Sequence, residues 1–397
     1  MNIPKNVMSV IQTLENAGFE AYIVGGCVRD MLLNIAPEDF DITTSATPDE
    51  IKKLFPHTVD IGIKHGTVAV IVMGEKIEVT TYRVDGEYID GRRPESVMFT
   101  SNINEDLSRR DFTINAIAYN PRVGFCDPFC GHEGIKKKLI KCVGDADTRF
   151  NEDALRMVRA VRFAATLGFD IDGKTCMSIL ANKKNLNLVS PERIYAELKK
   201  MITGAYPDAL NIIKNTGLMP YILRGGNINY ARLPELIQYM KICPADYHMR
   251  LALLFDSICK NYGDVLEALK VDNQTKHFVY VYMSFLHKPL APDSYEIKKT
   301  LRHMPPPLFD NLLKLQEIVL QNVYVNEIKL MKNEILQNGE CYELKQLAVN
   351  GGDLAALGIK EGRQMGALLE GLLDKVMQNP ELNNKITLLD YVNQDTL

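Results

Sequence analysis

Three features are missing from this 397-residue chain, and each absence narrows what the protein can be. No run approaches the roughly 18 consecutive apolar residues that a membrane span requires. The eight cysteines contain no Cys-x-x-Cys pair, which favours reduced, partly buried thiols in a reducing compartment. Basic residues are not in excess, because the formal net charge is −4, so any nucleic-acid binding requires a local basic surface.

The amino-terminal stretch also lacks the apolar core and the cleavage site of a signal peptide, and its periodicity predicts an amphipathic helix. Together with the thiols, this predicts a cytoplasmic protein. Hydrophobic residues at 46% and charged residues at 24% are typical of globular domains. A chain of this length exceeds what one hydrophobic core usually holds, so we expect two or more domains. The oligomeric state is left open.

The most informative stretch combines a glycine turn with a pair of acids. Gly25 and Gly26 end a short apolar strand, and Arg29 follows in a short helix, so backbone N–H groups and a guanidinium can cradle an anion. Asp39 and Asp41 are two residues apart, and in an extended segment such side chains share a face. Paired hard oxygens beside a phosphate cradle predict Mg²⁺ and phosphate chemistry.

Two later stretches supply further candidates. The segment after residue 58 alternates like a β-hairpin, and it places Glu78 on a neighbouring strand, either as a third carboxylate or as a solvent-facing side chain. In the string RRDFTINA, Arg110 is a candidate nucleotide contact. Asp111 and Asn115 lie four residues apart, which predicts one shared helical face shaped around a sugar.

An arginine-rich helix is predicted from Asn151, which can cap it, to Gly168, which can end it. One face carries Asp153 and then arginines at steps of three residues: Arg156, Arg159 and Arg162. Glu152 and Asp153 cannot neutralise three guanidinium groups, so the unbalanced row predicts a phosphate or base ligand.

Together these stretches resemble the active-site signatures of the nucleotidyltransferase superfamily that includes DNA polymerase β. More narrowly, they resemble the bacterial-type (class II) tRNA CCA-adding enzymes and their poly(A) polymerase relatives. The resemblance is strong over roughly the first 200 residues and moderate over about the last 60. It implies an α+β protein with a polymerase-β-like head followed by an all-α neck, body and tail. The expected bounds are 1–144, 145–204, 205–325 and 326–397.

The resemblance also implies roles for the residues. Asp39 and Asp41 would hold Mg²⁺, which activates the 3′-hydroxyl of tRNA and steadies the departing pyrophosphate. The implied nucleotide-binding residues are Gly26, Arg29, Arg110, Asp153, Arg156, Arg159 and Arg162. Cytosine and adenine both present an amino donor beside an unprotonated ring nitrogen, so the Asp153 carboxylate and the Arg156 guanidinium would select them together and reject uracil and guanine.

The implied activity is template-independent addition of CCA to the 3′ end of tRNA from CTP and ATP. Three alternatives stay open: an enzyme that adds only the terminal adenosine, a poly(A) polymerase, and a non-catalytic RNA-binding protein. The polar segment from Arg83 to Val97 resembles a flexible loop of the adenosine-adding members, which favours terminal adenosine addition. No membrane partner is expected.

Overall fold

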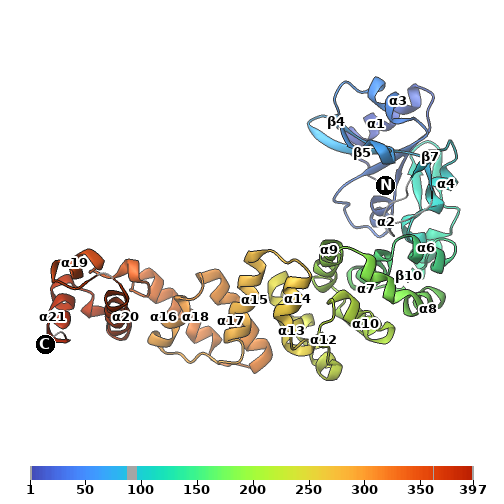
Figure 1. Ribbon diagram of the computed structural model, residues 1–397. Helices are drawn as coiled ribbons and strands as arrows, with labels where there is room; N and C mark the ends of the chain where they lie inside the picture. Colours follow the sequence, from blue (N-terminus) through green and yellow to red (C-terminus); the bar gives the residue numbers. More distant parts are fainter. Residues whose placement is uncertain (1, 87–95, 361, 396–397) are drawn as a thin grey trace. The chain divides into compact units, whose positions relative to one another are not determined.

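The structure is a computed structural model that describes residues 2–86, 96–360 and 362–395. The chain divides into two compact units, Met1–Leu233 with Ile258–Val271, and Pro234–Ser257 with Asp272–Leu397. Among the described residues every strand lies in the first unit, and the chain from α12 to α21 is helical (Figure 1). The predicted α+β class is therefore confirmed. The finer division into four parts stays a prediction.

A seven-stranded mixed sheet forms the amino-terminal part of the first unit. In spatial order its strands are β3 (Thr58–Gly62), β4 (Thr67–Val72), β5 (Glu75–Thr81), β2 (Asp41–Thr44), β1 (Ala21–Val24), β8 (Ala118–Asn120) and β9 (Gly124–Cys126). β2 and β5 are parallel, and the other neighbours are antiparallel. The predicted hairpin is β4 and β5, which turn at Met73 and Gly74, both with positive φ.

Alternation along the strands separates the two faces of this sheet. Ile23, Ile42 and Val79 are register neighbours with no exposed surface, and α1 and α3 pack on their side. The opposite face carries Asp41 next to Glu78. Because side chains alternate along a strand, burying one face in the core leaves these carboxylates on the other.

Helices of the first unit surround the sheet and continue beyond it. The α-helices are α1 (Lys5–Asn16), α2 (Gly26–Leu32), α3 (Pro48–Leu54), α4 (Ile103–Ser108), α5 (Gly131–Lys136), α6 (Ala146–Glu152), α7 (Leu155–Leu167), α8 (Gly173–Asn182), α9 (Pro191–Ile202), α10 (Leu210–Thr216), α11 (Met219–Ile222) and α14 (Tyr262–Ala268). The 3₁₀ turns are η1 (Ile63–His65), η2 (Thr113–Asn115), η3 (Lys183–Leu188), η4 (Pro207–Ala209) and η5 (Tyr230–Arg232). Two small sheets pair β6 (Arg83–Asp85) with β7 (Val97–Phe99), and β10 (Leu139–Ile140) with β11 (Asp170–Ile171).

Two predicted helical segments differ from the structure. The helix expected from Asn151 is two helices, because α6 ends at Glu152 and α7 begins only after Ala154. Gly168 ends α7 in the left-handed conformation, as predicted. Asp111 and Asn115 do not share a regular helix, since a turn separates α4 from the short η2.

The segment predicted as a loop, Arg83 to Val97, lies only partly within the described residues. Its two ends pair as β6 and β7. Residues 87–95 lie outside the described residues.

The second unit is built from helices. They are α12 (Leu233–Ile242), α13 (Tyr247–Ile258), α15 (Asn273–Phe285), α16 (Ser294–Leu301), α17 (Pro306–Leu320), α18 (Val325–Gln337), α19 (Gly351–Ala356), α20 (Arg363–Gln378) and α21 (Lys385–Asp395), with 3₁₀ turns η6 (Leu344–Gln346) and η7 (Pro380–Leu382). Near the carboxyl terminus Leu354, Leu373 and Leu388 belong to one buried cluster that joins α19, α20 and α21. Within the described ranges, none of the helices combines the length and the apolar character needed to cross a bilayer.

Candidate active site

The glycine turn lies between β1 and α2 and is shaped around an arginine. Gly25 has a φ of 83°, a conformation that favours glycine. A Cβ atom at this position would lie 3.0 Å from Arg110 Nη1. The turn therefore leaves room for the Arg110 guanidinium beside the start of α2.

Asp41 begins β2, and Asp39 lies two residues before the strand, so the pair does not belong to one regular strand. Both residues are exposed. Glu78 on β5 is the register partner of Asp41 and forms an ion pair with Lys76, 3.0 Å away. Protein atoms around the Asp41 carboxyl limit its hydration and raise its pKa; Arg110 opposes this, whereas Asp39 and Glu78 add to it.

The carboxylates suit a hard divalent cation by their chemistry, since exposed oxygen donors are what such ions prefer. Across the described part of the chain, no group of three or more His, Cys, Asp or Glu side chains has the arrangement of a metal site. Asp41 and Glu78 are register neighbours on adjacent strands, and the charges of Asp39 and Glu78 both act on the Asp41 carboxyl.

Arg29 starts a chain of hydrogen bonds that crosses the site. Its Nη1 donates to Asn115 Oδ1 at 2.7 Å, and Asn115 Nδ2 donates to Asp111 Oδ1 at 3.0 Å. Asp111 Oδ2 accepts from Arg159 Nε and Nη2 at 2.9 and 2.8 Å. The contact expected between Asp111 and Asn115 exists, although a turn and not a helical face produces it.

Asp111 is buried within this chain of contacts. Burial alone would raise the pKa of its carboxyl. The charge of Arg159 and the hydrogen bonds from Asn115 and Arg159 outweigh burial, with a further contribution from Arg156, and they lower the pKa to about 2. Asp111 is therefore ionised at neutral pH and acts as a fixed acceptor between α7 and the glycine turn.

The arginines of α7 are balanced by acids from other elements, so the predicted unbalanced row is wrong. Arg159 contacts both Asp111 and Glu197, and Arg162 Nε donates to Glu197 Oε2 at 2.9 Å. Glu197 lies on α9, far from α7 in sequence. The Arg162 and Arg159 side chains also lie against the Phe163 ring. The ring centroid is 3.6 Å from Arg162 Cζ and 5.5 Å from Arg159 Cζ.

Asp153 and Arg156 are the predicted base-selecting pair. In the structure each of them binds other protein groups. Asp153 lies in the break between α6 and α7, where Arg193 from α9 binds it through Nη2 at 2.7 Å. Arg156 Nη1 binds Glu152 Oε2 at 2.5 Å. Arg156 Nη2 donates to the Arg109 carbonyl oxygen at 3.0 Å.

These side chains surround a single cavity of about 460 Å³. Its lining includes every predicted site residue except Asp39: Gly26, Arg29, Asp41, Arg110, Asp153, Arg156, Arg159 and Arg162. A cavity of this size is within the range of small-molecule sites. Arg110 Nε is buried and has no hydrogen-bond partner within the described residues.

Comparison with known proteins then decides the family. The model of the poly(A) polymerase head domain matches residues 21–141. The CCA-adding enzyme of Limosilactobacillus reuteri is 38% identical over 396 residues, which cover 98% of this chain and 96% of that protein. The chain belongs to the CCA-adding enzyme family.

Other family members agree over different lengths. The CCA-adding enzyme of Geobacillus thermodenitrificans is 50% identical over 219 residues, so that match spans 54% of the relative's own length. The crystal structure of the Bacillus stearothermophilus CCA-adding enzyme in complex with CTP has a TM-score of 0.86 and 30% identity, covering 100% of this chain and 99% of that one. The Thermotoga maritima CCA-adding enzyme complexed with tRNA_CCA shares the fold, with a TM-score of 0.66 and 18% identity over 98% and 94% of the chains.

Two further family models match later parts of the chain. The model for the RNA and SrmB-binding site of polymerase A matches residues 168–227, and a model of tRNA nucleotidyltransferase domain 2 matches residues 248–392. Nucleotidyltransferases of this family generally use a divalent metal ion.

Sequence reasoning missed several residues of this CCA-adding-family site. Arg109, Phe163 and Arg193 line the cavity, and Glu197 and Asp106 hold its arginines. Arg193 falls within the first 200 or so residues, over which the chain resembles the family, and that resemblance was the available signal. Glu197 lies at least 35 residues from the arginines it pairs with, so no local pattern marks it. Asp106 lies only three and four residues before Arg109 and Arg110, but this spacing is also common on exposed helices and does not show that Asp106 is buried.

Proposed function

We propose that this protein adds cytidine, cytidine and adenosine in turn to the 3′ end of tRNA, using CTP and ATP and releasing pyrophosphate. The observation that carries the proposal is the cavity beside Asp41, which gathers the glycine turn, seven arginines of the first unit and Asp153 around one space. The family to which the chain belongs supports it, as do relatives named for complexes with CTP, ATP and tRNA.

Mg²⁺ is the ion we propose for Asp39 and Asp41, because carboxylate oxygens are the ligands it prefers. When bound, it would favour deprotonation of the attacking 3′-hydroxyl and offset charge on the departing pyrophosphate. Glu78 is close enough to Asp41 to affect its pKa, so it adds negative potential at this site.

The chain's own residues bind and orient the triphosphate. Gly26 allows the backbone at the start of α2 to approach a phosphate, and Arg29 and Arg110 supply guanidinium donors. Arg159 and Arg162 line the cavity from α7 as further guanidinium donors, with their charge balanced by Asp111 and Glu197. Phosphoryl-group chemistry of this kind depends on positioning and electrostatics, so the site requires no nucleophilic side chain.

Base selection is proposed for Asp153 and Arg156. An ionised carboxylate only accepts hydrogen bonds and a guanidinium only donates them, so the pair matches the amino group and ring nitrogen of cytosine or adenine. Uracil and guanine would leave both groups unsatisfied. Arg193 supports this role, because it fixes the Asp153 carboxylate from a second helix.

The proposed organisation is a catalytic head (1–144), a neck carrying the base-selecting residues (145–204), a helical body (205–325) and a tail that contacts tRNA (326–397). Family models over residues 21–141, 168–227 and 248–392 support a head followed by RNA-binding parts. Because the proposed substrate is tRNA, we also propose that the protein acts in the cytoplasm.

The test supplies the full-length protein with tRNAs that end before CCA, after C, or after CC, and with CTP and ATP singly and together. Full CCA addition extends all three substrates to one end point and then stops. Extension of only the CC-ending tRNA would indicate an enzyme that adds the last adenosine. Long adenosine tails would indicate a poly(A) polymerase, and no extension under any condition would overturn the proposal.

A further inference from the structure

Asp106, at the carboxyl-terminal end of α4, is a buried carboxylate that lies outside the cavity. Its side chain has no exposed surface. Oδ1 accepts from Arg109 Nε at 3.0 Å and Nη2 at 2.6 Å, and Oδ2 accepts from Arg110 Nη2 at 3.3 Å. One carboxylate thus holds two consecutive arginines, both of which line the cavity.

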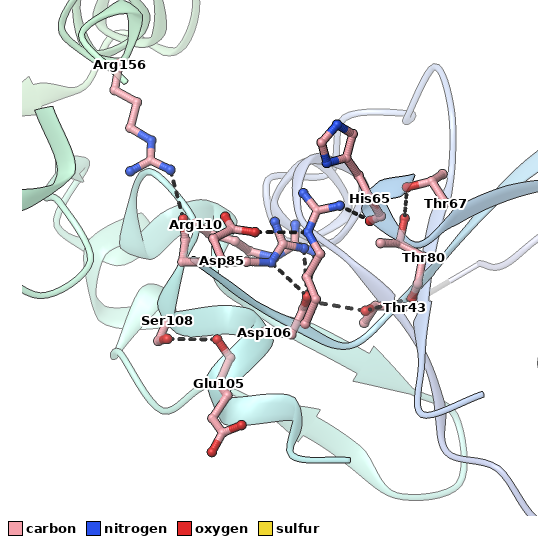
Figure 2. A network of polar contacts seen from close by, with 12 residues as sticks. Thr43, His65, Thr67, Thr80, Asp85, Glu105, Asp106, Ser108, Arg110 and Arg156 are labelled. Atoms are coloured by element: carbon pink, nitrogen blue, oxygen red, sulfur yellow. Dashed lines mark hydrogen bonds and ion pairs between the residues drawn. The ribbon is translucent and has the colours of Figure 1, made fainter. Parts of the chain in front are cut away.

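The same carboxylate reaches β2, the strand that begins with Asp41. Thr43 Oγ1 donates to Asp106 Oδ2 at 3.2 Å, and Thr43 lies on β2 two residues after Asp41. Figure 2 shows Asp106 between Thr43 and Arg110, with the hydrogen bonds to both drawn. Asp106 therefore connects the catalytic strand to an arginine of the proposed phosphate cradle.

The contacts continue to the base-selecting residues. Arg156 Nη2 donates to the main-chain carbonyl of Arg109, the residue whose side chain Asp106 holds (Figure 2). An unbroken series of hydrogen bonds thus runs from Arg156 through Arg109 and Asp106 to β2.

The charge of Asp106 maintains this arrangement. Burial by itself would raise the pKa of its carboxyl, but the charges of Arg110 and Arg109 and their hydrogen bonds outweigh burial and lower it. The two guanidinium groups are adjacent in sequence and partly buried, so they repel each other without the carboxylate between them.

We propose that Asp106 is a positioning residue that sets both base selection and turnover. It places Arg110 beside the glycine turn and fixes the Arg109 carbonyl that orients Arg156. The inference rests on the proposed function of the site, since it assumes that Arg110 contacts the triphosphate and Arg156 contacts the base. It predicts that loss of the Asp106 charge lowers turnover and nucleotide discrimination together.

The test compares the full-length variant Asp106→Asn with Glu105→Gln, a matched control on the same helix. Glu105 is exposed and accepts from Thr100 Oγ1. For each, kcat and KM are measured with CTP and the incorrect UTP on tRNA that ends before CCA, and with ATP on tRNA that ends in CC. Thermal unfolding is measured in parallel. A misplacement of about 1 Å can cost on the order of a hundredfold in rate. We expect Asp106→Asn to lower kcat by at least about tenfold and to lower the CTP-to-UTP ratio of kcat/KM by a similar factor, and Glu105→Gln to leave both unchanged.

Several results would overturn the inference. One is a folded Asp106→Asn protein with wild-type kcat and wild-type discrimination. Another is activity that falls only in proportion to the folded fraction, with an unchanged CTP-to-UTP ratio, because that pattern is a loss of stability alone. Failure of the wild-type protein to extend any tRNA would instead count against the proposed function itself.

Thr43→Val keeps the inference testable if Asp106→Asn does not fold. It removes the hydroxyl that reaches Asp106 Oδ2 at 3.2 Å and the Thr80 carbonyl oxygen at 3.3 Å, and it leaves both arginines paired with Asp106. We expect lower kcat with discrimination close to wild type, because the contacts to Arg109 and Arg156 remain. Unchanged kcat in Thr43→Val would contradict the proposed link to the catalytic strand. If both single variants fold, the double variant should lower kcat by less than the two single effects combined. Both changes remove the same contact, the one between Thr43 and Asp106.

Discussion

Arg193 on α9 binds Asp153 with two hydrogen bonds, Nη2 to Oδ2 at 2.7 Å and Nη1 to Oδ1 at 3.3 Å. The two residues are 40 positions apart, and Asp153 lies where α6 ends. Side-by-side pairing of this kind fixes the plane of the carboxylate as well as its position. It also leaves Asp153 with little rotational freedom at the edge of the cavity.

Arg193→Met should therefore mainly weaken the preference for CTP over UTP, and should have a smaller effect on the free energy of unfolding. Without its partner the Asp153 carboxylate can rotate, and we expect the kcat/KM ratio of CTP over UTP to fall by about tenfold. Single-turnover incorporation on tRNA that ends before CCA measures this ratio. Lys200→Met, an exposed change on the same helix, serves as the control. A ratio equal to wild type in Arg193→Met would contradict the positioning role of Arg193.

The acid pair should be required for chemistry and not for nucleotide binding. We expect Asp39→Ala and Asp41→Ala each to lower incorporation by at least about a thousandfold, since metal-ion stabilisation of developing charge contributes several kcal/mol. CTP binding, measured by calorimetry, should largely survive because the arginines remain. Glu38→Ala, an exposed neighbour, is the control. Near-normal turnover in either aspartate variant would show that the metal assignment is wrong.

Gly25→Ala should raise KM for CTP and ATP. The new Cβ atom would lie 3.0 Å from Arg110 Nη1 and displace that guanidinium, while the backbone at φ 83° and ψ −130° costs a non-glycine residue on the order of 1–3 kcal/mol of stability. Gly18→Ala is the control for an added methyl group at positive φ, because Gly18 has a φ of 88° and no heavy atom within 4 Å of the added methyl group. Equal KM values for the two would rule out steric displacement of Arg110.

Asp111 should stabilise the first unit in a pH-dependent way. Its pKa of about 2 lies below the ordinary value near 3.9, so its contribution is fully present above about pH 4 and is lost as the pH falls toward 2. Asp111→Asn should therefore destabilise the protein by on the order of 2 kcal/mol at neutral pH. Hydrogen exchange of α7 amides reports this difference for the first unit alone.

The pH series supplies the check on Asp111. The difference between wild type and Asp111→Asn should narrow steadily between pH 4 and pH 2. Asp60→Asn, which breaks an exposed ion pair with Lys52, should have far less effect at any of these pH values. A difference for Asp111→Asn that stays constant with pH would show that packing, not charge, causes the loss.

Local sequence determined the parts of this protein that depend on short-range geometry. A strand, two glycines and a following helix indicate a tight turn, so the turn before α2 was predictable from residues 21–32. Period-two alternation indicated the hairpin of β4 and β5. The spacing of Arg156, Arg159 and Arg162 correctly indicated one stripe of α7, and the signatures identified the family.

Only the tertiary structure shows which groups pack against the face of α7 that carries Arg156, Arg159 and Arg162. Periodicity shows which face of a helix a side chain is on, but it does not show what packs against that face. The acids that balance Arg159 and Arg162 come from Asp111 and Glu197, each at least 35 residues away, so composition near α7 wrongly suggested unpaired charge. Arg109 and Arg110 are sequence neighbours of Asp106, but only the tertiary structure shows that Asp106 is buried and that Thr43, 63 residues away, donates to the same carboxylate. Such convergence is set by packing of distant elements, because a buried charge is stable only where its partners surround it.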